Sequence, residues 1–221
     1  MWHYVTTDDY NWAPQFGTEY TDNAREIWDT LVNEHGWTEN SASAVLGNFQ
    51  VESFLNPGQW ELNRNYSMNY GMGLGQWTPA TKVSNFIGSA DKDAMADGAK
   101  QMLLFFKYPG QYKTTYLNPD GTSTYYNESG LPYITSMEEF SQSNESIHNL
   151  TKVWAICWER PGNTHYTNSI GNRMSYADHW FNEFSGSPPQ PPTPPQPPTP
   201  EEVEAMVMTM LMFRRKSKLD K

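Results

Sequence analysis

The clearest pattern of hydrophobic and polar positions lies between Thr38 and Ser53. Its apolar residues follow the i, i+3, i+4, i+7 spacing of one helical face: Ala42, Val45, Leu46 and Phe49. Thr38 is suited to the N-cap position, and Asn56-Pro57-Gly58 predicts a stop by turn chemistry. Glu52 continues the apolar face, because about 100° per residue brings it within roughly 20° of Val45 after two turns. The sequence therefore predicts a helix that ends with a carboxylate on its buried side.

The same period predicts other helices along the chain. A capping-box pattern at Asn23 and Glu26 predicts a start, followed by an apolar stripe that ends at Gly36. Further helices are expected from Thr78 to Gly88, over 93–107, from Ser136, over 144–159 and near 172–184. Residues 58–77 lack a helical period and predict a small β-hairpin lobe, while 108–135 predict an inserted hairpin or long loop. The expected fold class is α+β, mostly α.

The two ends of the chain differ from the middle. Residues 1–20 have no helical period and predict an N-terminal arm packed on a domain that covers 21–185. Residues 186–200 repeat a Pro-Pro-Gln-Pro-Pro-Thr unit, which predicts a polyproline linker. In 201–221 an apolar run lies between an acidic start and a basic end, which suits the helix dipole. We expect an amphipathic segment that docks on a partner.

Composition excludes several classes of protein. The formal net charge of −10 argues against binding to a phosphate backbone, so no nucleic acid is expected as a partner. The single cysteine, Cys157, allows no intrachain disulfide, and its place among tryptophans favours a buried thiol over a nucleophile. The five histidines show no metal-ligand spacing, so neither a metal nor another cofactor is expected. No signal peptide and no transmembrane run are visible.

Glu52 carries the most informative chemistry in the sequence. Burial favours the protonated form of a carboxyl group, which is the form that a general acid for glycoside cleavage must have. The alternative is a helix-end glutamate that pairs with a lysine or arginine. A second carboxylate, Glu61, falls in the expected hairpin lobe, where it either faces Glu52 across a cleft or is a solvated strand residue. In Glu159-Arg160 we favour a buried structural pair over catalysis.

Several motifs in this order resemble the phage tail lysozyme family, especially the lysozyme domain of tail-tip proteins from small podoviruses of Gram-positive hosts. They are Gly47–Ser53, Asn56-Pro57, Gly71–Thr78, Trp158–Pro161 and Tyr176–Phe184, so the resemblance covers roughly Thr21 to Ser185. The order of Glu-Ser, Asn-Pro and a Gly-rich run ending in Gln is also similar to goose-type lysozymes and lytic transglycosylases. The resemblance implies a lysozyme-like fold, with Glu52 at the position of the catalytic acid.

The resemblance also implies a substrate and a place of action. It implies a muramidase that cleaves the β-1,4 bond between N-acetylmuramic acid and N-acetylglucosamine in peptidoglycan glycan strands. Residues at sugar-contacting positions would be Gln50, Asn56, Trp60, Tyr70, Gln76 and Trp77. A wall enzyme without an export signal fits a virion protein at the phage tail tip, acting from outside during DNA delivery. Partners would then be tail-tip or knob proteins, with a membrane surface as the runner-up for 201–221. The alternatives are a lytic transglycosylase and a non-catalytic wall-binding or plug module.

Overall fold

The structure is a computed structural model that describes residues 1–9 and 19–186. The second half of the expected arm, nearly all of the proline-rich linker and the 201–221 segment lie outside the described residues. The elements in chain order are α1 (Glu19–Trp28), η2 (Asp29–Glu34), α2 (Glu39–Ser53), α3 (Thr81–Ile87), α4 (Lys92–Met95), α5 (Gly98–Lys107), η3 (Pro109–Gln111), α6 (Met137–Ser141), α7 (Ile147–Trp154), η4 (Ala155–Glu159) and α8 (Asn163–Phe184). The expected predominance of helix is confirmed.

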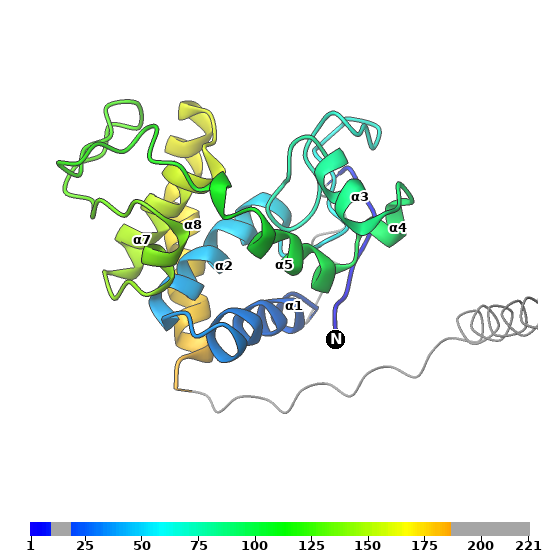
Figure 1. Cartoon of the computed structure of the whole chain (residues 1–221), viewed down its shortest axis with the longest axis horizontal. Helices are drawn as coiled ribbons and strands as arrows, with labels where there is room; N and C mark the ends of the chain where they lie inside the picture. Colours follow the sequence, from blue (N-terminus) through cyan, green and yellow to red (C-terminus); the bar gives the residue numbers. More distant parts are fainter. Residues whose placement is uncertain (10–18, 187–221) are drawn as a thin grey trace, which may run out of the picture. The chain divides into compact units, whose positions relative to one another are not determined.

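Helix α2 lies at the centre of the fold, with α1, α7 and α8 around it (Figure 1). Its N-cap is Thr38, whose side chain accepts a hydrogen bond from the Ser41 N–H, as the sequence predicted. Every residue from Ser41 to Gln50 is buried, so α2 is enclosed on all sides rather than along one stripe. Gly47 permits the close crossing of α8, because a Cβ there would lie 2.3 Å from the Arg173 carbonyl oxygen.

Aromatic side chains fill the core around α2. Trp154 and Trp158 stack with ring centroids 4.9 Å apart, and Phe105 packs against both of them. Helix α7 continues into the π-helical turn η4, so that Trp154 to Trp158 are all buried. Glu159 and Arg160 therefore directly follow a buried segment whose tryptophans are packed in the core.

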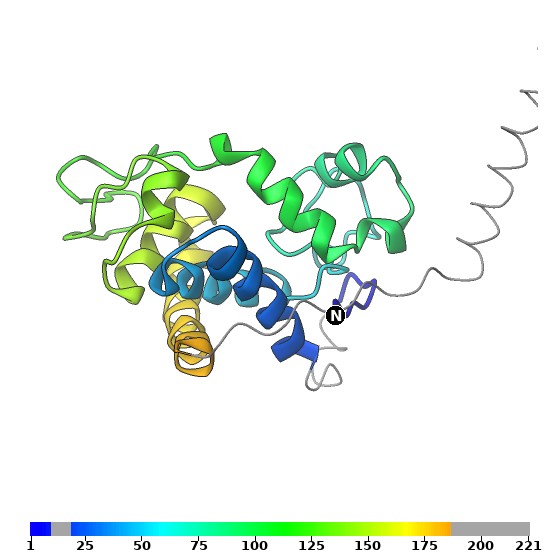
Figure 2. The same ribbon diagram turned by 60° about the horizontal axis from the view of Figure 1, so that its bottom comes forward.

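The expected β-hairpin lobe is not formed. Among the described residues, strand-like pairing is limited to isolated bridges such as Trp60 with Met72 and Ser123 with Glu128. Left-handed backbone at Asn63, Asn65 and Tyr66 interrupts any extended run. The buried side chain of Gln101 satisfies backbone groups that a partner strand would otherwise bind. It accepts a hydrogen bond from the Leu74 N–H at 2.9 Å and donates one to the carbonyl oxygen of Pro57 at 2.7 Å. The second lobe consists of loops 54–80 with α3 and α4, connected through α5 (Figure 2).

Several expected helix boundaries are wrong. The last helix, expected near 172–184, begins at Asn163 as α8. Helix α1 begins at Glu19, and Asn23 is buried inside it, where its side chain binds the backbone of His3 and Leu55. The 93–107 segment divides at Ala96-Asp97 into α4 and α5, each with its own aspartate cap, and Leu103 is 59% exposed instead of inward. Thr78-Pro79, expected to open a helix, precedes α3 as a cis peptide.

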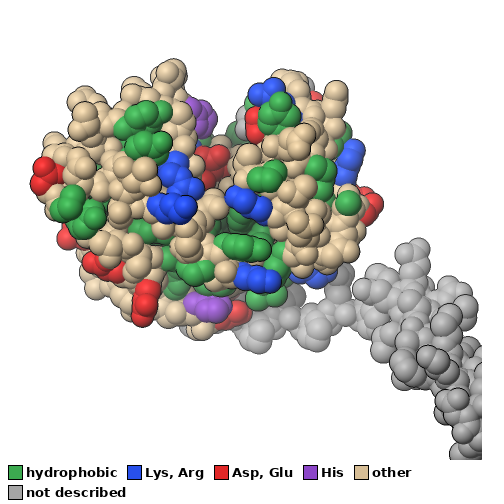
Figure 3. Space-filling model, turned by 45° about the horizontal axis from the view of Figure 1, so that its top comes forward, with side chains coloured by type: hydrophobic (Ala, Val, Ile, Leu, Met, Phe, Trp, Pro, Cys, Tyr) green, Lys and Arg blue, Asp and Glu red, His purple; other side chains and the backbone are tan. Residues whose placement is uncertain are grey.

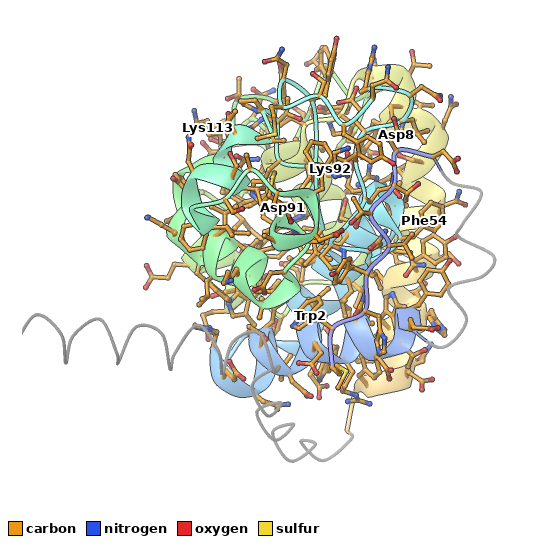
Figure 4. The ribbon with its side chains drawn as sticks, turned by 90° about the vertical axis from the view of Figure 1, so that its right-hand side faces the viewer. Trp2, Asp8, Phe54, Asp91, Lys92 and Lys113 are labelled. Atoms are coloured by element: carbon orange, nitrogen blue, oxygen red, sulfur yellow. The ribbon has the colours of Figure 1, made fainter. Side chains whose placement is uncertain are left out.

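Residues 1–9 run across the domain in an extended form, from Trp2 near α1 to Asp8 near the loops (Figure 4). Val5 exchanges two hydrogen bonds with the Asn56 side chain, at 3.0 and 2.7 Å. Thr7 pairs in parallel with Gln59, and the Asp8 carbonyl accepts from the Asn63 N–H. The indole of Trp2 lies directly on Gly98, where any side chain would collide with it.

Candidate active site

A cleft of about 590 Å³ separates the helical lobe from the loop lobe. Figure 3 shows it as a notch with acidic side chains inside it and lysine and arginine side chains on its walls. The C-terminal turn of α2 and the corner between η4 and α8 form one wall, while loops 61–78 and the start of α3 form the other. The carboxylates that line the cleft are Glu52, Glu61 and Glu159.

Glu52 is fixed at the cleft by Arg173. The Arg173 Nη2 donates to Glu52 Oε1 at 2.5 Å, and the Glu52 side chain is 16% exposed while that of Arg173 is fully buried. Arg173 also donates to Asn48 Oδ1 at 2.8 Å and to Ser169 Oγ at 3.2 Å, so α2 and α8 both hold its guanidinium. The ion-pair alternative for Glu52 is therefore real, but its partner is a buried arginine that aims the carboxylate into the cleft.

Glu159 is the second carboxylate of this cluster. It ends η4, and its Oε1 accepts a hydrogen bond from the Trp154 indole N–H at 3.2 Å. Burial raises the pKa of Glu159 well above its usual range, the charge of Glu52 adds to the rise, and the charge of Arg173 opposes it. Burial and the neighbouring charge of Glu52 therefore both favour the protonated form of Glu159.

The interpretation of Glu159-Arg160 as a structural pair is wrong. Among the ion pairs of the described residues, none joins Glu159 to Arg160. Arg160 Nη1 instead donates to the carbonyl oxygens of Gln111 and Cys157, at 2.6 and 3.1 Å. The left-handed φ of 50° at Arg160 turns the chain there, so the two neighbouring side chains diverge.

Glu61 reaches the cleft from the loop lobe. Its Oε2 accepts a hydrogen bond from the Gly71 N–H at 3.0 Å, and its Oε1 pairs with Arg64 at 3.2 Å. The Glu61 side chain is 37% exposed, so it is a solvated residue and a cleft residue at once. Glu61 therefore lines the cleft from a loop, and not from the strand that the sequence suggested.

The expected sugar contacts divide between the cleft and the interior. Gln76 lines the cleft, and its amide donates to the carbonyl oxygens of Gln59 and Gly73, each at 3.1 Å. The structure does not bring the other expected contacts to the cleft lining: Gln50, Asn56, Trp60, Tyr70 and Trp77. Of these, only Tyr70 is exposed, with its ring under Arg64.

The buried four take structural roles because their polar atoms or rings face the core. The Gln50 side-chain oxygen accepts from the Trp180 indole at 3.2 Å, and Asn56 holds Val5. Trp60 and Trp77 are each 1% exposed and present no ring face to a sugar. Trp60 and Trp77, expected at sugar-contacting positions, are therefore core residues.

Sequence reasoning missed Arg173. The signal was present, because Arg173, Ala177, Trp180 and Phe184 follow the spacing of one buried helical face on α8. A cation in such a stripe requires a buried partner, in the same way as the carboxylate of Glu52 on α2. Lys82 was also missed, and nothing in the local pattern at the start of α3 distinguishes it from a solvated lysine.

The described residues contain neither a metal-ligand cluster nor a helix that could span a membrane. Within 1–9 and 19–186, no group of three or more His, Cys, Asp and Glu side chains is arranged to hold a metal ion. In the same ranges, no helix has both the length and the apolar character needed to cross a membrane.

A central helix that ends with a glutamate at a cleft between a helical lobe and a smaller lobe defines a lysozyme-like domain. The phage tail lysozyme profile matches residues 22–184, and the chain belongs to that family. Morphogenesis protein 1 of Bacillus phage B103 is 32% identical over 168 residues, which cover 76% of this chain. The chain spans 40% of the length of that relative.

Proposed function

We propose that this chain is a peptidoglycan hydrolase of a phage particle, a muramidase that cleaves the β-1,4 bond between N-acetylmuramic acid and N-acetylglucosamine. The observation that carries the proposal is the cluster of Glu52, Glu159 and Arg173 at the cleft. Family membership and the similarity to a phage morphogenesis protein support a virion location and a role in local wall penetration during DNA delivery.

Glu52 is the general acid in this mechanism. Cleavage requires a proton on the glycosidic oxygen as its bond to the anomeric carbon breaks. The carboxyl cluster at the cleft can hold such a proton, because burial and the charge of Glu52 raise the pKa of Glu159. Glu52 is the member of the cluster that Arg173 fixes at the cleft, and Glu159, whose protonated form is favoured by burial, lines the same cleft. The buried guanidinium then compensates the charge that remains after transfer.

Glu61 serves the opposite side of the bond. The Gly71 N–H and Arg64 fix its carboxylate on the loop lobe, facing the same cleft as Glu52. From there it stabilises positive charge that develops on the sugar ring and orients the attacking water. Gln76, on the same wall, offers an amide to a substrate acetamido group.

The test compares release of reducing sugar from purified Gram-positive walls by wild type, Glu52→Gln, Glu159→Gln and Glu61→Gln. Glu183→Gln is the matched control, because Glu183 is exposed on α8, the helix that carries Arg173. Loss of a general acid lowers the rate by about 10²–10⁴-fold, so Glu52→Gln should fall by that factor while the control keeps full activity. Circular dichroism verifies that each variant is folded.

Two outcomes would refute parts of this proposal. Equal activity of wild type and Glu52→Gln, or inertness of both on every wall tested, refutes Glu52 as the acid, and general inertness supports a binding or plug module. Mass spectrometry of the released fragments identifies the acceptor: products lighter by one water indicate attack by the muramyl 6-hydroxyl, the reaction of a lytic transglycosylase. Hydrolysis leaves the full mass.

A further inference from the structure

Two cationic side chains line the same cleft from opposite lobes. Lys82 comes from the first turn of α3, and Arg160 follows η4 at the corner that leads into α8. Glu52, Glu61 and Glu159 line the same cleft, and Glu159 directly precedes Arg160 in the sequence. Figure 3 shows acidic side chains inside the notch and basic ones on its walls.

Neither cation makes a salt bridge with another described residue, although the charge of Arg160 also acts on Glu159. Both hydrogen bonds of Arg160 leave from Nη1 to backbone carbonyls, so its Nε and Nη2 edge has no partner among those residues. A guanidinium held on one side with two parallel N–H donors on the other is shaped for a carboxylate.

Lys82 and Arg160 also affect one another electrostatically. Partial burial lowers the pKa of Lys82, and the charge of Arg160 lowers it further. Two like charges that face each other across a partly buried cleft are unfavourable by themselves. An anion placed between them removes the repulsion and gains attraction to both.

We propose that Lys82 and Arg160 bind a carboxylate of the wall peptide carried by the muramic acid residue beside the bond to be cut. This inference rests on the proposed function for its substrate and adds a requirement to it. The N-acetylglucosamine units are neutral, whereas the muramic acid units carry peptides that end in carboxylates. Because the cations share the cleft with Glu52, we assign to them an anionic group of the glycan strand held there.

The consequence is selectivity for peptide-bearing glycan strands over bare ones. A neutral glycan leaves both cations facing each other, while a peptide-bearing strand neutralises them. The planar guanidinium of Arg160 fixes the orientation of the bound carboxylate, while the flexible side chain of Lys82 supplies a point charge that can adjust its position. The preference should weaken as ionic strength rises, because both side chains are only partly buried.

The experiment measures binding of the product disaccharide N-acetylglucosaminyl-N-acetylmuramyl-peptide to the full chain by calorimetry. A muramidase does not cut this ligand, so binding is measured without turnover. The same disaccharide with its peptide carboxylates converted to amides is the neutral reference. Wild type should bind the acidic ligand about five- to tenfold more tightly, the size expected for one or two partly exposed ion pairs.

Three variants test the assignment, and a fourth is the control. Lys82→Gln and Arg160→Gln should each reduce the affinity ratio by about threefold, and Arg160→Lys should lie between wild type and Arg160→Gln. Lys100→Gln makes the same charge change on the first turn of α5, outside the cleft lining, and should leave the ratio unchanged. Lys82→Gln and Arg160→Lys keep the test valid if Arg160→Gln does not fold.

A ratio of one in wild type, or an unchanged ratio in both Lys82→Gln and Arg160→Lys, overturns the inference. Tight binding of a glycerol phosphate oligomer, in competition with the acidic disaccharide, would also overturn the inference. The two cations would then bind phosphodiester groups of the wall and not the peptide carboxylate. If the affinity ratio is found but walls release no fragments, the proposed hydrolysis fails while the anion site stands.

Discussion

Replacement of Arg173 by methionine is the sharpest test of how the carboxylate cluster is held. Arg173 is fully buried and donates to Glu52, Asn48 and Ser169. The methionine side chain keeps most of the volume but leaves Glu52 and Glu159 without a compensating cation. Loss of one partner from a buried pair costs about 3–5 kcal/mol in the free energy of unfolding. For a domain of this size, each kcal/mol corresponds to about 2–4 °C, so Tm at neutral pH should fall by roughly 6–20 °C.

The loss should depend on pH in a defined direction. The pKa of Glu159 is raised in the folded state, so its contribution to stability is fully present below the unfolded pKa and is lost as pH rises through the folded pKa. Arg173 opposes this rise, so its removal moves the folded pKa of Glu159 further up. At acid pH a protonated Glu159 needs no cation. Arg173→Met should therefore approach wild-type stability at low pH and diverge from it as pH increases.

Thermal unfolding followed by circular dichroism at pH 4.5 and pH 7.5 measures both effects. Arg64→Met is the control, because the Arg64–Glu61 pair is exposed and such pairs contribute about 0–1 kcal/mol. The double variant Arg173→Met with Glu52→Gln should regain part of the lost stability, since one of the stranded charges is gone. A Tm within about 3 °C of wild type at both pH values would refute the view that Arg173 compensates buried charge.

Three further predictions concern the helix crossing, the thiol and the domain boundary. Gly47→Ala should cost about 1–3 kcal/mol, because the added Cβ meets the α8 backbone at 2.3 Å, whereas Gly171→Ala, with open space around it, should be neutral or stabilising in chemical denaturation. Cys157 should react with a thiol reagent only after unfolding, because burial raises its pKa to about 11; rapid labelling of the folded protein would contradict this. Truncation after Ser185 should leave wall hydrolysis intact and abolish incorporation into the particle or self-association, and loss of activity in a folded truncated domain would place the boundary elsewhere.

The hydrophobic period of the sequence predicted helix α2 and the position of Glu52 at its C-terminal end. The α2 stripe and its Thr38 cap are local features, and local features are what a 3.6-residue period reports. The same reasoning misplaced the start of α1, because Asn23 uses its amide for tertiary contacts to His3 and Leu55 instead of a cap. A capping pattern specifies hydrogen-bonding capacity, and the fold decides where that capacity is used.

The rest of the candidate site depends on distances between segments. Glu52 and Arg173 are 121 positions apart, and only the close crossing of α2 and α8 joins them. Glu159 is the last residue of the π-helical turn η4. Such a turn shifts the helical register, so the 3.6-residue period does not predict the side of the helix on which Glu159 lies. Residue type did not reveal depth either: Trp60 and Trp77 suit a sugar-binding wall by composition, yet both are core.

The extended arm has a consequence for how a substrate would enter. Its residues bind α1 through Asn23, the loop lobe through Asn56 and Gly58, and α4 through the Thr6–Asp93 contact. One short segment therefore connects the helical lobe to the loop lobe through hydrogen bonds. A hinge motion that moves the two lobes apart must break these hydrogen bonds together. The width of the cleft is then set before a glycan arrives, so little ordering cost remains to be met on binding. If the chain cuts wall glycan as proposed, the cleft would accept strands that fit its existing width instead of closing around them.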